Sequence, residues 1–206
     1  MLFNILALIS LLVMMMALRT LVEVFPSLMA CLIRSKESIN LEASAQLSRS
    51  RSVLAFCLIA PFCLLVWQRG LYTPAFLEGF DENTSLGITF GVFAAYVLIR
   101  KMMEFIIRNR VRNSKIYEAA RKSGLTFFII LTLTLLAMSG IMSILDTPAD
   151  AMRSAMLWVS ASIYLIYLLR KTQILISSAA FFAAFLYLCA LELIPTGALA
   201  ASAIIF

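Results

Sequence analysis

Glu192 is the ionisable side chain of this sequence that stands out for possible chemistry, because it lies inside a long apolar run, Phe185-Leu-Tyr-Leu-Cys-Ala-Leu-Glu-Leu-Ile-Pro195. A charged residue within a membrane span is expensive and usually functional. A helix that begins near Thr172 would place Glu192 about twenty residues along, close to the far membrane surface. There the carboxylate would be hydrated. If the chain after it folds back, Glu192 would instead be buried, and it would carry a proton or link helices.

Two neighbours of Glu192 complete the candidate functional site. Tyr187 and Cys189 lie five and three residues before it, and supply a hydroxyl and a thiol in the same apolar run. Four alanines at positions 179, 180, 183 and 184 precede them and favour close helix packing. The pattern does not resemble an ion path.

Other catalytic, metal or cofactor chemistry finds no support in the sequence. There is no histidine, which removes the commonest general base and metal ligand. The four cysteines form no CxxC pair, so we expect free thiols. Asp146 and Asp150 are separated by Pro148 and are expected to form a solvated acidic turn. We therefore expect a non-enzymatic protein with no cofactor, no metal and no catalytic residue.

The composition predicts a membrane protein. Hydrophobic residues make up 63% of the 206 residues and charged residues only 14%, against roughly 45–50% and about 25% in soluble domains. A soluble fold of this length could not bury so much apolar surface. The sequence therefore predicts a single all-α integral membrane domain, a transmembrane helical bundle over residues 1–206.

Apolar runs of the length that a bilayer requires, about 20 residues per span, predict about six transmembrane helices. Pro26 is expected to end the first helix and Pro61 to kink the second. Leu21–Ile33 is too short to span alone and could lie in the interface. The apolar tail 196–206 could be a kinked extension, a re-entrant arm or a packing plug. The expected spans are approximately 1–18, 52–67, 84–103, 125–145, 155–169 and 172–194.

A basic segment between the third and fourth spans, Arg100 to Lys122, predicts a helical hinge in the cytoplasm. A short helix is expected to start at Ser114 and end near Gly124. Anionic lipid headgroups, rather than nucleic acid, are the expected partners of its cations. These lipid-facing basic residues are Arg100, Lys101, Arg108, Arg110, Arg112, Lys115, Arg121 and Lys122.

The distribution of positive charge predicts the orientation. Alternate loops hold fifteen Lys and Arg residues, whereas the loops on the opposite side hold only Arg69 and Arg153. Basic loops stay in the cytoplasm. We therefore expect both termini outside the cytoplasm and a basic inner surface.

A small-residue motif, Gly87-x-x-x-Gly91, lies in the third span. Such motifs let two helices approach closely, although they also arise by chance in apolar runs. We expect these glycines to serve helix packing.

The stretch from Phe185 to Pro195 resembles the C-terminal signature, FLYLCxLExxP, of a family of uncharacterised integral membrane proteins found in Bacteroidota. That family carries a domain of unknown function. The resemblance implies a bacterial inner membrane and assigns no catalytic residue. We expect a structural or accessory subunit that binds other membrane proteins or a second copy of itself. The alternative is a small transporter or channel, proton-linked through Glu192.

Overall fold

The computed structural model describes residues 2–33, 44–74, 79–108, 114–176 and 181–205. These residues are helical apart from short turns and connections, and they contain no strand. Six helical stretches are long and apolar enough to cross a membrane, which confirms the expected all-α bundle of six spans. The helices are α1 (Leu2–Ile33), α3 (Ala45–Cys57), α4 (Ile59–Gln68), α5 (Glu82–Arg108), α6 (Ser114–Ile144), α7 (Ala149–Ile176), α8 (Phe181–Leu188), the π-helix η2 (Cys189–Leu193) and α9 (Ile194–Ile205).

Prolines shape the first two spans differently. The second span consists of α3 and α4, which meet at a turn on Leu58. Pro61 has no N–H for the carbonyl of Cys57 and so favours this break, as expected. Pro26, in contrast, lies inside α1, which continues to Ile33. The expectation that Pro26 ends the helix is therefore wrong, and the 21–33 segment is part of the first helix.

The other helices run past their expected ends. α6 starts at Ser114 as expected, but it continues through Gly124 to Ile144. α7 continues through Lys171 to Ile176, so the expected spans 155–169 and 172–194 do not match the helices. The sixth span covers Phe185–Ala203, and the tail after Pro195 belongs to it as helix α9.

Two residues with a positive φ angle end helices at one end of the bundle. Gly70, with φ 59°, follows α4, and the N–H of Leu71 donates to the carbonyl of Val66. Asp146, with φ 48°, follows α6, where the N–H of Thr147 donates to Met142. Both patterns are left-handed helix caps. Asp146 thus belongs to the acidic turn that was expected around Pro148, whereas Asp150 lies in the first turn of α7.

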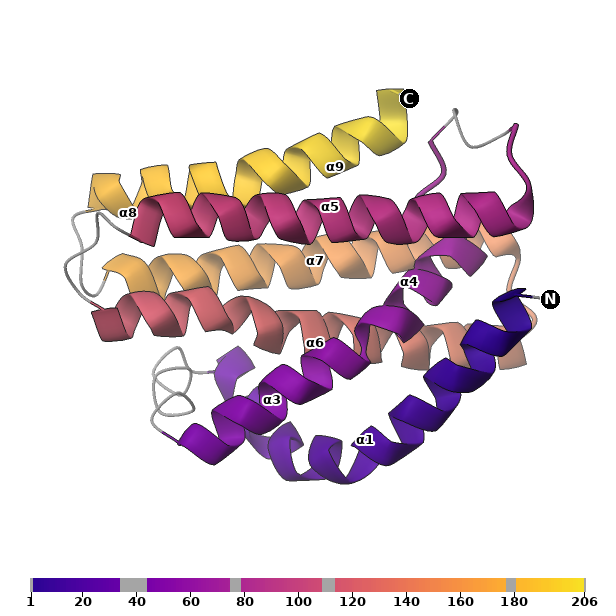
Figure 1. Cartoon of the computed structure of the whole chain (residues 1–206), viewed down its shortest axis with the longest axis horizontal. Coiled ribbons are helices and arrows are strands. Elements are labelled where there is room, and N and C mark those ends of the chain that lie inside the picture. Colours follow the sequence, from indigo (N-terminus) through magenta and orange to yellow (C-terminus); the bar gives the residue numbers. More distant parts are fainter. Residues whose placement is uncertain (1, 34–43, 75–78, 109–113, 177–180, 206) are drawn as a thin grey trace.

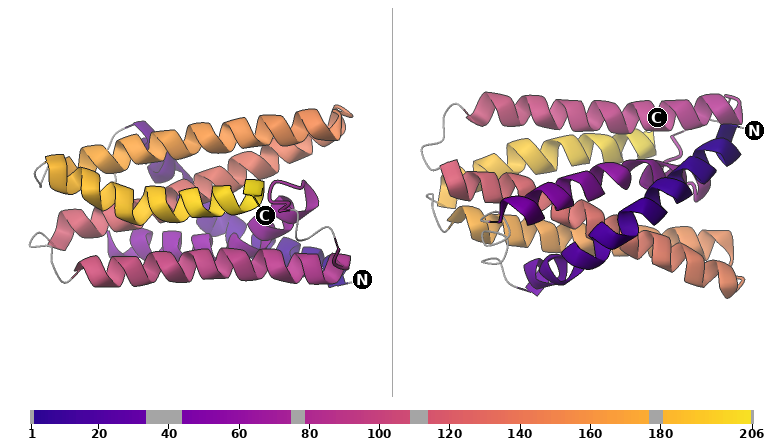
Figure 2. Two further views of the ribbon diagram at one scale, coloured as in Figure 1. Left: turned by 90° about the horizontal axis from the view of Figure 1, so that it is seen from above. Right: turned by 60° about the horizontal axis from the view of Figure 1, so that its bottom comes forward.

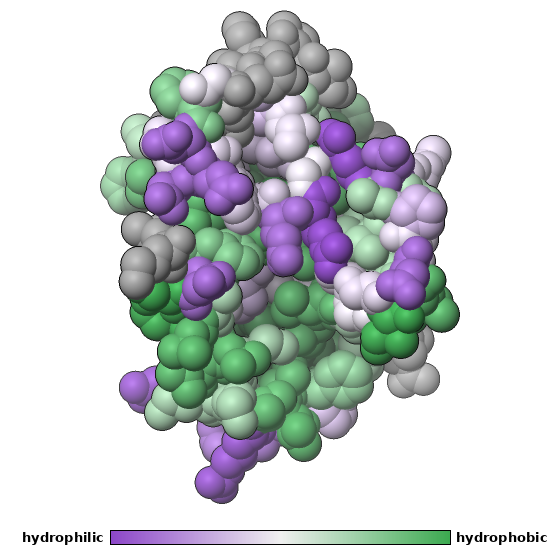
Figure 3. Space-filling model, turned by 90° about the vertical axis from the view of Figure 1, so that its right-hand side faces the viewer, coloured by the Kyte–Doolittle hydropathy of each residue, from purple (hydrophilic) through white to green (hydrophobic). Residues whose placement is uncertain are grey.

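The spans lie side by side, and both termini lie toward the same end of the bundle (Figure 1). α6 and α7 pack along each other in the middle, whereas α1 crosses α3 and α4 on one side and α5 forms an outer edge (Figure 2). Hydrophilic residues gather across the end that carries the caps, above a hydrophobic region (Figure 3).

Three apolar clusters hold the described helices together. The first joins α1, α3 and α6 around Leu28, Leu54 and Ile129. The second joins α4, α6 and α7 around Leu135 and Met156. The third joins α6, α7 and the last span, through Ala120, Ile174, Leu175, Tyr187 and Leu191. Tyr187 of the third cluster lies over Lys171, which pairs with Glu192, so the candidate site lies between spans that are far apart in the sequence.

Candidate functional site

The candidate site is a cluster of charged side chains between three spans. Glu192 comes from η2, Arg100 from α5, and Tyr167 and Lys171 from α7. Tyr167 and Lys171 are four residues apart, so they share one face of their helix. Arg100 lies one to two turns before the end of its span at Phe105. The cluster therefore lies within the membrane, near the end where α5 and α7 finish.

A π-helical turn presents Glu192 to this cluster. The N–H of Ile194 donates to the carbonyl of Cys189, five residues earlier. Pro195 follows directly and offers no N–H of its own. The wider turn accommodates the proline without ending the helix, and such turns occur frequently at functional sites.

One carboxylate oxygen receives three hydrogen bonds. Oε1 of Glu192 accepts from Nη2 of Arg100 at 2.7 Å, from the hydroxyl of Tyr167 at 2.6 Å and from Nζ of Lys171. The other oxygen, Oε2, is buried and has no hydrogen-bond partner among the described residues. Both Glu192 and Lys171 have 0% exposed side chains. The pair therefore forms a salt bridge that is closed to solvent.

The hydroxyl of Tyr167 connects the two cations. It accepts from Arg100 at 2.8 Å and from Lys171 at 3.1 Å, and it donates to Glu192. A phenol has one proton to donate and two lone pairs that accept, so its capacity is filled. The hydroxyl thus fixes where both cations lie around the carboxylate.

Aromatic rings surround the lysine. Its Nζ lies 5.5 Å from the ring centre of Tyr167 and 5.4 Å from that of Tyr187. The distance to Tyr187 falls within the range of cation–π attraction, whereas the hydrogen bond of 3.1 Å to the Tyr167 hydroxyl places the ammonium near the edge of that ring. The Tyr187 ring therefore serves the site through its face.

A second carboxylate balances the charge. Nε of Arg100 lies 3.8 Å from Glu104, one turn further along α5, as expected from the i, i+4 spacing. The side chains of Arg100 and Glu104 are 20% and 15% exposed. Among the described side chains, these two cations and two carboxylates balance in charge, which lowers the penalty of burying them.

Gly124 on α6 makes room for Arg100. A Cβ atom at this position would lie 2.7 Å from Nη2 of Arg100 and 3.4 Å from the hydroxyl of Tyr167. The first distance is too short for two heavy atoms that are not bonded. Any larger residue would therefore move the guanidinium that contacts Glu192.

The structure corrects the expected environment of Glu192. The carboxylate is fully buried rather than hydrated, because the last span begins near Phe185 and Glu192 lies in its first half. The tail does not fold back over it but continues as α9. Of its expected neighbours, Tyr187 is buried against Lys171, and Cys189 is half-buried.

Arg100, Tyr167 and Lys171 are side chains whose role in the site the sequence did not reveal. Arg100 and Lys171 each follow an apolar run, and Arg100 was expected to face lipid headgroups. Arg100 is mostly buried and Lys171 completely so. A usable signal was that Tyr167 and Lys171 share one helix face, since a polar pair at that spacing within an apolar helix needs a partner.

The other residues expected to face lipid headgroups have mixed outcomes. Lys101 is exposed, whereas Lys122 is half-buried and donates to Ser48 at 3.3 Å. The described side chains do not include those of Arg108, Arg110, Arg112, Lys115 and Arg121.

Gly87 and Gly91 pack on nothing within the described part of the chain. Both are exposed, and a Cβ atom at either position would meet no atom within 4 Å. The close helix approach that their spacing predicted is therefore absent among the described helices. Packing against another chain stays a prediction.

The remaining expectations on chemistry concern thiols and metals. All four cysteines are free, as expected, and Cys31 and Cys63 are buried. Within the described ranges, no three His, Cys, Asp or Glu residues gather in a way that could hold a metal ion.

Six apolar spans around a buried cluster of ion pairs define a multi-pass α-helical membrane protein. The chain belongs to the family described as a domain of unknown function, DUF4271, whose model matches residues 4–201. No curated protein and no solved structure matches the chain.

Proposed function

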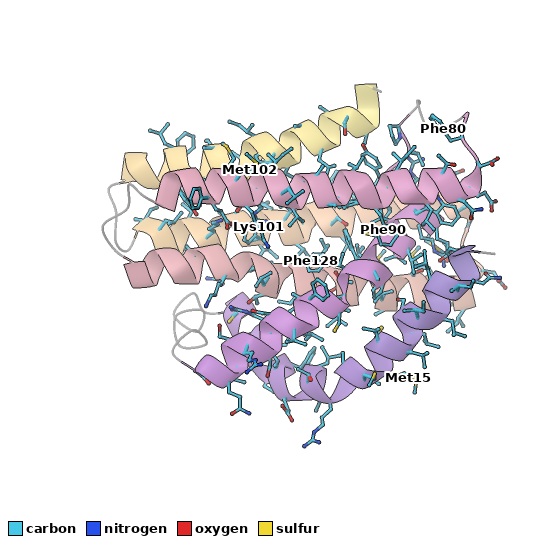
Figure 4. The ribbon with its side chains drawn as sticks, viewed as in Figure 1. Met15, Phe80, Phe90, Lys101, Met102 and Phe128 are labelled. Carbon is cyan, nitrogen blue, oxygen red and sulfur yellow. The ribbon has the colours of Figure 1, made fainter. Side chains whose placement is uncertain are left out.

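We propose that this protein is a non-enzymatic structural or accessory subunit of a bacterial inner membrane, which binds other membrane proteins or a second copy of itself. The observation that carries the proposal is an unpartnered face of α5. Gly87 and Gly91 share this face with Leu98, Met102 and Phe105 by helical spacing. All five are exposed, and Figure 4 marks Met102 on α5.

Glycine on a lipid-facing surface needs an explanation. It weakens a helix relative to alanine or leucine, and against disordered lipid it gains no packing in return. Against another helix it allows close approach, which is the main source of helix association in membranes. The exposed glycines therefore favour a helix of another protein as their contact.

α1 offers a second open surface. Together with α5 it is the least buried of the six spans. Exposed apolar side chains recur along it at helical spacing, and Met15, labelled in Figure 4, is one of them. The stripe comprises Leu8, Leu11, Leu12, Met15, Met16 and Val22.

The geometry of the cluster favours a role for Glu192 as a link between helices. Its carboxylate connects the last span to α5 and α7 through Arg100 and Lys171. Protonation would leave two mostly buried cations with one fewer negative charge, which is costly away from water. A tightly bonded carboxylate of this kind holds spans together more readily than it carries protons.

The alternative is a small transporter or channel that is proton-linked through Glu192, and the buried carboxylate favours it. The two functions differ in an assay of flux. A transporter would give substrate-dependent flux in proteoliposomes that Glu192→Gln abolishes. An accessory subunit would show no flux and would retain a partner in mild detergent.

A test of the proposed interface uses the open glycines. We expect Gly87→Leu with Gly91→Leu to remove the co-purifying partner or second copy, because bulky side chains prevent close approach. The fold should persist, since neither position meets an atom within 4 Å. Co-purification in mild detergent followed by mass spectrometry measures the effect.

Gly140→Leu is the matched control. Gly140 lies in the fourth span, is exposed and has equally open surroundings, but it belongs to no such motif. The interface proposal fails if the partner survives the double substitution, or if Gly140→Leu removes it equally well.

The proposed orientation places both termini and the turn before α7 outside the cytoplasm, because positive charge stays inside. A cysteine introduced at Pro148, which is exposed, should react with a membrane-impermeant thiol reagent added to intact cells. A cysteine introduced at Ser114 should react only after the cells are opened. The opposite result would invert the orientation.

A further inference from the structure

We infer that Arg100, Lys171 and Tyr167 form a preorganised carboxylate-binding site, and that Glu192 occupies it as a ligand supplied by the last span. The inference does not depend on which partner the protein binds. It assigns the chemical class of ligand, a small carboxylate. Arg100, Lys171 and Tyr167 are called the receptor, and Glu192 is called the occupant.

The receptor is held in place by contacts other than the carboxylate. Tyr167 accepts from both cations at 2.8 and 3.1 Å. Lys171 also lies over the ring of Tyr187, and Arg100 is paired with Glu104 and lies against Gly124. These contacts keep three donors directed at one point, as preorganised anion sites require.

The three donors of the site serve only one oxygen of the occupant. All three donors converge on Oε1 of Glu192, and the buried Oε2 has no partner among the described residues. A carboxylate confined by its own backbone accepts this arrangement, whereas an optimally placed one would use both oxygens. The receptor therefore supplies its three donors to one oxygen of the occupant and leaves the other oxygen without a described partner.

The test removes the occupant and supplies a free one. Glu192→Ala deletes four heavy atoms, Cγ, Cδ and the two oxygens, which are the four heavy atoms of acetate. We expect sodium acetate to restore the thermal stability of the purified variant. A ligand of four heavy atoms binds no tighter than about 0.05 mM, so half-maximal restoration should fall near millimolar acetate.

The expected size of the stabilisation by acetate follows from mass action. At a concentration 100 times its dissociation constant, acetate should shift the unfolding equilibrium of Glu192→Ala about 100-fold toward the folded state. The wild-type protein should not respond, because Glu192 fills the site. Acetamide, which matches acetate in size and lacks its charge, should have no effect on the variant.

Three outcomes would overturn the inference. Acetate fails to stabilise folded Glu192→Ala, or acetamide stabilises it equally by merely filling space, or acetate still stabilises the Arg100→Gln and Glu192→Ala double variant. Sodium chloride at equal ionic strength controls for screening. Glu23→Ala, at an exposed pair with Arg19, is the matched variant and should ignore acetate.

If Glu192→Ala does not fold, Glu192→Gln tests the same inference. Glu192→Gln keeps the volume of the side chain and removes its charge, so the two cations of the receptor repel each other without a shared counter-charge. Adding Lys171→Gln should then raise stability, although Lys171→Gln alone should lower it. If Lys171→Gln lowers stability in both backgrounds by the same amount, Lys171 does not belong to a carboxylate receptor.

Discussion

Glu192→Gln should lower the free energy of unfolding by about 3–5 kcal/mol, the range measured when one partner of a buried ion pair is removed. The amide retains the size of the carboxylate but not its charge. Lys171, with no exposed surface, and Arg100, which is mostly buried, then lose their shared counter-charge. Thermal or denaturant unfolding of the purified protein in detergent measures the loss.

The ion pair between Arg19 and Glu23 supplies the internal control. It has the same types of charge, but its side chains are 91% and 51% exposed. Exposed pairs contribute little, so Glu23→Gln should change stability by less than about 0.5 kcal/mol. Similar losses for Glu192→Gln and Glu23→Gln would show that burial adds nothing and that the cluster does not hold the last span.

The number and type of the spans followed from the sequence because the membrane imposes them. A bilayer core about 30 Å thick requires about twenty predominantly apolar residues per helix, and six helices of the described chain are long and apolar enough to meet this requirement. The ends of the helices were harder to predict, because a charged residue does not by itself end a helix. Lys171 follows an apolar run, but α7 continues past it to Ile176. A charged residue ends a span only when water receives it.

Of the candidate site, the sequence predicted the carboxylate but not the side chains that bind it. Glu192 stands out because a lone carboxylate in an apolar run must find a partner. Its partners lie 92 and 21 residues away in the sequence, on helices whose packing local patterns do not determine. The π-helical turn that presents Glu192 was also not predictable, although Pro195 marked the place. The prediction that Pro26 ends the first helix was wrong because a membrane helix tolerates proline where neighbouring groups satisfy the freed carbonyl.

Gly124→Ala should destabilise the protein by about 1–3 kcal/mol, the usual range for overpacking a buried contact. A methyl group at this position would lie 2.7 Å from Nη2 of Arg100. An arginine side chain is flexible and could normally move away. Here Nη2 of Arg100 donates hydrogen bonds to Tyr167 and Glu192, so movement of the guanidinium would break two hydrogen bonds of the cluster.

Gly140→Ala on the same helix separates this effect from helix propensity. Alanine favours a helix over glycine by about 1 kcal/mol, and nothing lies within 4 Å of a Cβ at Gly140. Gly140→Ala should therefore be neutral or stabilising while Gly124→Ala is destabilising. Replacing Arg100 with methionine should remove most of the difference, because the guanidinium is then gone. If the two alanine variants unfold alike in the presence of Arg100, Gly124 does not position the guanidinium that holds Glu192.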